Sequence, residues 1–169
     1  AQLADKSDML GRLIAVEQLR GKKEALGKLK DALNNDPFHG VRLAAAQSIR
    51  AIQSDEALDA LLASTQQSDA RVRRQVAADI AGFYRETSYA AARKLLKAER
   101  NPDIQAVALA SLGAYAKPEV REALLESLHS TTYRNSLADA AIGGIRAQDN
   151  AEYIAPLLEV LQKRESEFT

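Results

Sequence analysis

The sequence of 169 residues is 46% hydrophobic and 27% charged, with 23 basic residues balanced by 23 acidic ones. The zero net charge excludes bulk attraction to nucleic acid or to an anionic membrane as the main function. Since the sequence has no cysteine, it also excludes a disulfide scaffold, a thiolate metal site and a cysteine nucleophile. No stretch approaches the roughly 18 to 20 apolar residues of a membrane span. We expect a soluble protein of the cytoplasm or the periplasm.

The only methionine is Met9. We therefore expect residues 1–169 to be one repeat domain that was processed or excised from a longer chain.

The residue choice favours helices along the whole chain. There are 32 Ala and 22 Leu but only 8 Ile and 7 Val, so helix formers dominate and strand formers are scarce. We expect no strand, and Leu95 and Leu96 are predicted core residues. The apolar spacing and the capping residues predict about ten helices. They span residues 8–20, 22–34, 40–52, 55–66, 70–84, 88–99, 102–115, 118–129, 135–147 and 150–163.

One helical segment recurs at offsets of 30 to 33 residues. Residues 41–49 align with residues 72–80, 104–112 and 137–145, and residues 12–19 form an earlier copy. We call the recurring helices second-type helices and the leucine-rich helices between them first-type helices. The chain opens on a second-type helix and closes on a first-type helix, each without its pair partner. Such a period predicts stacked helix pairs that share one core, so the fold class is all-α, a right-handed α/α superhelix or α-solenoid.

Residues 36–42, Asp-Pro-Phe-His-Gly-Val-Arg, resemble the start of the second helix of a HEAT repeat, and residues 69–73 and 101–104 are weaker copies. The resemblance implies a solenoid of compact HEAT-like units. In longer HEAT proteins, an Asp and an Arg of each unit form a ladder of ion pairs. Because Gln105 and Ala138 stand at the Arg positions of the later copies, we expect the ladder only as far as residue 73.

Residues 8–13 together with residues 35–42 resemble a narrower group. They are similar to the HEAT-like carboxy-terminal region of bacterial zinc aminopeptidases of the aminopeptidase N superfamily. This resemblance implies a non-catalytic accessory domain that shapes substrate access or mediates assembly. The superfamily motif His-Glu-x-x-His is absent from the sequence, so no catalytic residue, metal ligand or cofactor carries over.

The remaining residues offer no chemistry of their own. His39 and His129 lack a second ligand at metal-binding spacing. His129 is expected to stabilise a helix end. Gly143 and Gly144 lie inside a predicted helix, where close helix packing explains them better than phosphate binding. The chain alone is therefore predicted not to be an enzyme.

Arginines recur on the predicted concave face, which the second-type helices line. The candidate interaction residues are Arg12, Arg42, Arg50, Arg73 and Arg74, flanked by Arg20 and Arg85. Such a stripe binds carboxylates, an acidic protein surface or phosphates, which arginine contacts in a bidentate way. The alternative is a solvated face whose charges pair internally. The acidic residues available for this pairing are Glu17, Asp36, Asp69 and Asp79.

The first predicted helix carries Leu10, Leu13, Ile14 and Leu19, more than its neighbours can cover. We expect Leu10 to mark the end where the rest of a parent polypeptide, or a second copy, docks.

Two other functions remain open. One is a free-standing adaptor that binds a protein or peptide on the concave face. The other is a HEAT-like enzyme that processes nucleic acid. The second is disfavoured because such proteins use aromatic residues to hold exposed bases. Trp is absent here, and Phe38 and Phe83 fit helix-end packing.

Overall fold

The computed structural model describes residue 3 and residues 5–167, with the side chains of residues 133 and 164–167 excepted. In this part of the chain the regular structure consists of ten α-helices and short 3-10 turns, without a strand. The prediction of an all-α fold with ten helices is therefore confirmed.

The two helix types alternate along the chain. The second-type helices are α1 (Met9–Gln18), α3 (His39–Arg50), α5 (Ala70–Ala81), α7 (Pro102–Leu112) and α9 (Ser136–Gln148). The first-type helices are α2 (Leu26–Asn35), α4 (Asp55–Leu62), α6 (Glu86–Ala98), α8 (Pro118–Leu128) and α10 (Ile154–Glu167). Three 3-10 turns precede α2, α9 and α10. These turns are η2 (Lys23–Ala25), η3 (Tyr133–Asn135) and η4 (Ala151–Tyr153).

Helix α4 ends at Leu62, earlier than the predicted end at residue 66. The hydroxyl of Ser64 donates to the carbonyl oxygen of Ala60, and that of Thr65 donates to the carbonyl oxygen of Leu62. These side chains occupy carbonyl groups that a longer helix would need for its own backbone hydrogen bonds.

Short polar side chains define where several helices begin. Asp8, Ser54, Asp69 and Asn101 precede α1, α4, α5 and α7, and each accepts a hydrogen bond from a backbone N–H group of the first turn. Asn150 does the same for η4. Each bond satisfies an amide that has no partner inside its helix.

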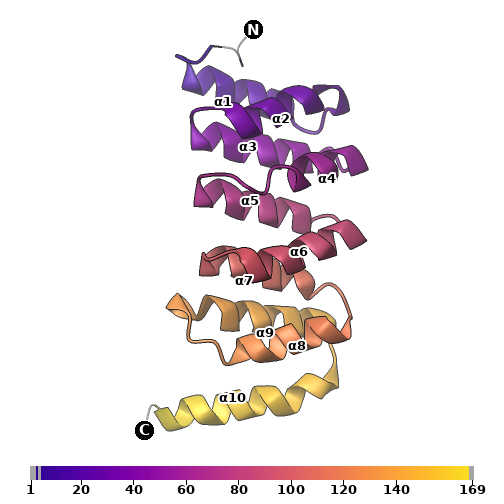
Figure 1. Cartoon of the computed structure of the whole chain (residues 1–169), viewed down its shortest axis with the longest axis vertical. Helices are drawn as coiled ribbons and strands as arrows, with labels where there is room; N and C mark the ends of the chain where they lie inside the picture. The colour runs from indigo at the N-terminus through magenta and orange to yellow at the C-terminus, as the bar shows by residue number, and fades with distance from the viewer. Residues whose placement is uncertain (1–2, 4, 168–169) are drawn as a thin grey trace. The chain divides into compact units, whose positions relative to one another are not determined.

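The chain divides into two compact units, residues 1–91 and residues 92–169. In the first unit α1, α3 and α5 lie side by side in that order (Figure 1), α2 packs on α3, and α4 contacts both α3 and α5. In the second unit α9 packs against both α7 and α8. The single domain predicted for residues 1–169 stays a prediction.

The core of the first unit forms where the leucines of the first-type helices meet the second-type helices. Leu29 and Leu33 of α2 and Leu61 of α4 are completely buried, in one cluster with Ala45 and Ile49 of α3. Removing these apolar side chains from water drives the stacking. The alanine allows neighbouring helices to approach closely.

In the second unit two glycines allow a close approach. A Cβ atom on Gly113 would lie 2.5 Å from the Cα atom of Gly144, and one on Gly144 would lie 2.6 Å from a methyl carbon of Leu124. Close packing at Gly144 is therefore confirmed, whereas the neighbouring Gly143 is exposed.

Leu95 and Leu96 are only half-buried, so the prediction that both are core residues is wrong. Helix α6 instead buries Tyr89 and Ala92.

Truncation of a buried leucine should lower the free energy of unfolding more than truncation of an exposed leucine. Leu109→Ala on α7 should lower the free energy of unfolding by about 2 to 5 kcal/mol, because Leu109 is completely buried. Leu161→Ala on α10 should cost less than about 1 kcal/mol, because Leu161 is exposed. Urea unfolding followed by circular dichroism measures both, and equal losses would contradict the assignment of the core.

Candidate functional site

Arg12 is the most buried member of the predicted arginine stripe. Its side chain is 2% exposed, and its Nε atom donates to Oδ2 of Asp36 at 2.7 Å. Its Nη2 atom donates to Oδ1 of the same carboxylate, and Nη1 donates to the carbonyl oxygen of Asp5 at 2.9 Å. These bonds raise the pKa of Arg12, chiefly through the hydrogen bond with Asp36.

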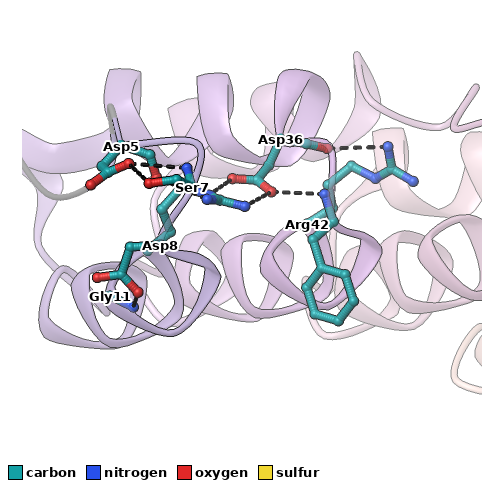
Figure 2. A network of polar contacts seen from close by, with 8 residues as sticks. Asp5, Ser7, Asp8, Gly11, Asp36 and Arg42 are labelled. Carbon is teal, nitrogen blue, oxygen red and sulfur yellow. Dashed lines mark hydrogen bonds and ion pairs between the residues drawn. The ribbon is translucent and has the colours of Figure 1, made fainter.

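Asp36 connects α1 to the start of α3. Figure 2 shows its carboxylate accepting hydrogen bonds from two sides, and one of them comes from the backbone N–H group of Phe38 at 2.9 Å. The prediction that Arg12 belongs to an accessible surface is therefore wrong. Because a buried guanidinium group needs a carboxylate partner, Arg12 pairs internally.

Arg42 and Arg73 occupy the positions equivalent to Arg12 in the next two second-type helices. The Nη1 atom of Arg42 donates to the carbonyl oxygen of Asp36 at 3.3 Å. That of Arg73 donates to the carbonyl oxygen of Gln67 at 2.9 Å. Each arginine thus holds the turn that precedes its own helix, six residues back along the chain.

The Asp–Arg ladder is interrupted after its first ion pair. The residue aligned with Asp36 in the next repeat is Gln67, and its Nε2 atom donates to Oδ1 of Asn34. Asp69 caps α5 and pairs with Arg71 at 2.7 Å, which holds the pKa of Asp69 well below its usual range. The expected ladder is therefore interrupted at Gln67, where an amide stands in place of the second carboxylate, and its extension to Arg73 stays a prediction.

Arg50 packs against the end of α5. Its guanidinium group lies 5.0 Å from the centre of the Phe83 ring, a cation–π contact. A Cβ atom at Gly82 would lie 1.8 Å from Nε of Arg50, so this arginine position requires the glycine. Arg50 is therefore engaged within the fold.

Asp79 on α5 is a buried carboxylate with an incomplete hydrogen-bond set. Gln75 donates to its Oδ1 atom at 3.0 Å, while its Oδ2 atom is buried without a hydrogen bond. Burial raises the pKa of Asp79 to about 6, and the Gln75 bond and the charges of Arg50 and Arg20 limit the increase.

The other arginines of the stripe are more exposed. Arg20 pairs with Glu17 at 3.5 Å, and Arg85 pairs with Asp55 at 3.2 Å. Arg74 is exposed. Internal contacts thus occupy much of the stripe, and ligand binding by Arg42, Arg50, Arg73 and Arg74 stays a prediction.

Three large apolar side chains are exposed together on α1. They are Met9, Leu10 and Ile14, and Leu10 has the largest exposed fraction, 60%. We call these three residues the docking row. The structure places Leu10 at the surface, where a docking role requires it to be, and that role stays a prediction.

A groove of about 700 Å³ lies between α1 and α2. Its walls include Ala15 and Leu19 of α1 and Gly27, Lys28 and Ala32 of α2. We call this cavity the end groove. Sequence reasoning missed it, because a groove depends on the distance between two helices and has no residue pattern of its own.

Neither histidine has the surroundings of a metal site. The ring of His39 lies 4.7 Å from that of Phe38, and His129 follows the last residue of α8 as its C-cap. Within the described residues, no three histidine or acidic side chains come together in a way that could hold a metal ion.

The comparisons with known proteins agree with this architecture over the first half of the chain. Residues 1–82 match the family model of HEAT repeats. The first part of the chain is thus similar to HEAT repeats. A search of curated proteins finds no match to it. HEAT repeats commonly mediate protein interactions, and the match therefore suggests an interaction or scaffold role. None of the described helices is both long and apolar enough to cross a membrane.

Removing the carboxylate from the buried ion pair should destabilise the first unit. Asp36→Asn should lower the midpoint of thermal unfolding by about 5 °C or more, because it leaves the Arg12 charge buried without a counter-charge. Asp55→Asn, which breaks the exposed pair with Arg85, should change it by less than about 2 °C. Calorimetry of both variants measures the difference, and equal shifts would show that the buried pair has no special role.

The raised pKa of Asp79 predicts a pH-dependent stability. The folded state keeps the proton up to about pH 6, whereas the unfolded state loses it near the usual value of 3.8. Stability therefore falls as the pH rises through this window. Asp79→Asn should increase the free energy of unfolding by about 1 to 3 kcal/mol at pH 7 and by much less at pH 4.

The control for this prediction is Asp59→Asn, since Asp59 is exposed on α4. Urea unfolding of the three proteins at both pH values measures the effect. A gain for Asp79→Asn that is equal at pH 4 and pH 7 would contradict the assignment.

Proposed function

We propose that the chain is a non-catalytic interaction domain that binds a protein partner through the docking row on α1. The observation that carries the proposal is the exposure of Met9, Leu10 and Ile14 on a single helix. Contiguous apolar side chains of this size on a surface favour burial against another protein. The buried ion pair holds α1 in place, since Arg12 of α1 bonds to Asp36, which precedes α3.

The partner in this proposal is the body of a bacterial zinc aminopeptidase in the same parent polypeptide. The resemblance of residues 8–13 and 35–42 to the carboxy-terminal region of those enzymes supports it. The fold adds support, because Arg12 from the first segment and Asp36 from the second form the buried ion pair. In this setting the domain shapes access to the active site or mediates assembly, and the chemistry belongs to the peptidase body.

The reading frame upstream of residue 1 tests the parentage. We expect it to continue for several hundred codons and to encode His-Glu-x-x-His followed by a glutamate that completes the zinc site. A frame that encodes no such motif would overturn the peptidase assignment.

Hydrogen exchange tests the docking row in the full-length parent protein. The α1 amides should exchange more slowly in the parent than in residues 1–169 alone, because the peptidase body covers the row. Leu10→Glu should abolish this difference, because a charge at the centre of the row opposes its burial. The matched variant Ile142→Glu changes an exposed isoleucine of α9 and should preserve it. If the α1 amides of the parent protein exchange equally slowly with and without Leu10→Glu, the proposal is wrong.

A further inference from the structure

A pocket smaller than the end groove lies in the second unit, between α6 and α8. Its volume is about 190 Å³. Sites that enclose a whole small molecule measure roughly 300 to 1,000 Å³, so this pocket has the size for a single side chain. The apolar part of its lining consists of Leu96 of α6, Leu112 of α7, and Val120 and Ala123 of α8.

Leu96 is uncovered at a position where another first-type helix buries its leucine. It stands eight residues before Ile104, as Leu33 stands eight residues before Val41 in an aligned copy of the repeat. Leu33 is completely buried, whereas Leu96 is half-buried and lines the pocket. Because α6 has repeats before and after it in the sequence, this opening belongs to the interior of the repeat array and not to one of its ends.

Contacts from α6 to its neighbours hold the walls of the pocket in place. Gln105 of α7 donates from Nε2 to the carbonyl oxygen of Leu96 at 3.2 Å. Arg93 of α6 lies 3.6 Å from Glu119 of α8, measured from Nη1 to Oε1. The first contact holds the end of α6 on α7, and the second links α6 to α8 at the rim. A pocket that is already formed costs its ligand less ordering entropy.

The rim of the pocket carries opposite charges on its two sides. Arg93 and Lys97 line the α6 side, and Glu119, Glu122 and Glu126 line the α8 side. Glutamates spaced three and four residues apart are neighbours on one face of a helix. Glu119 pairs with Arg93, but within the described residues no ion pair engages Glu122 or Glu126. The α8 side therefore has two carboxylates left for a cation from outside.

We propose that this pocket binds an arginine side chain of a partner protein. The aliphatic stem of the arginine packs against Leu96 and Val120, as long basic side chains do on apolar surface. Its guanidinium group bonds to Glu122 and Glu126, since the planar fork of donors can contact two carboxylates at once, which the point charge of a lysine does less well. The lining is partly apolar and partly acidic, and it thus matches both parts of the side chain.

The inference goes beyond the proposed docking of α1 and uses a different surface. The docking row belongs to the first unit, whereas every residue that lines the pocket belongs to the second. The pocket therefore gives the domain a second binding surface, for a protein segment that presents an exposed arginine.

The probe for this pocket is N-acetyl-argininamide, added to residues 1–169 and followed by NMR of the backbone amides. The signals of residues 93–97 and 119–126 should shift in a saturable way, with a dissociation constant on the order of 1 mM for so small a ligand. N-acetyl-citrullinamide has nearly the same shape without the charge, and the guanidinium ion has the charge without the stem. Each should bind more weakly than the arginine probe by about threefold or more.

Variants of the rim test the charges. Glu122→Gln combined with Glu126→Gln should weaken binding of the arginine probe by about threefold or more. The matched control is Asp103→Asn combined with Asp139→Asn, which removes two exposed carboxylates of the second unit that do not line the pocket. Lys97→Ala should strengthen binding, because it removes a cation from the rim.

Three results would overturn the inference. They are the absence of a saturable shift up to about 20 mM arginine probe, equal affinity for the arginine and citrulline probes, and binding that is unchanged by the loss of both glutamates. The last would identify nonspecific ion pairing at the surface. None of these results affects the proposed docking of α1 on a peptidase body, since that proposal fails only by the reading frame or by the exchange of α1 in the parent.

Discussion

A single helix pair of this chain cannot bury its own apolar surface, and the rest of the structure depends on that constraint. The leucines of a first-type helix need a second-type helix to cover them, and each second-type helix in turn needs a neighbour of its own type. In the first unit this need is met by α1, α3 and α5 lying side by side with α2 and α4 against them. Alanine on the second-type helices keeps the helices close enough for this arrangement.

The same constraint explains where apolar surface stays exposed. Leu33 on α2 is completely buried, while the aligned Leu161 on α10 is exposed. The two leucines are chemically identical and align with each other. Their different burial therefore comes from the packing around them and not from the residue type.

A few charged residues of this fold support the contacts between its helices. Arg12, Arg42 and Arg73 stand at equivalent positions, and each donates a hydrogen bond to a backbone carbonyl of the segment that precedes its own helix. Asp79 lies buried with one oxygen that has no hydrogen bond, and its raised pKa is the reason we expect the stability of the chain to depend on pH. A guanidinium group has several donors in one plane, so one side chain can satisfy two carbonyl or carboxylate groups at once.

The sequence by itself determined the helical class, the alternation of two helix types and their approximate bounds, because apolar periodicity and capping residues act locally. It also indicated that the apolar side chains of the first helix are more than its neighbours can cover, and Leu10 is indeed exposed. Only the tertiary structure decided that Arg12 is buried, that Gln67 interrupts the ladder, that Leu96 is half-buried and that a groove opens between α1 and α2. Those features depend on distances between helices far apart in the sequence, and a periodic pattern carries no information on such distances.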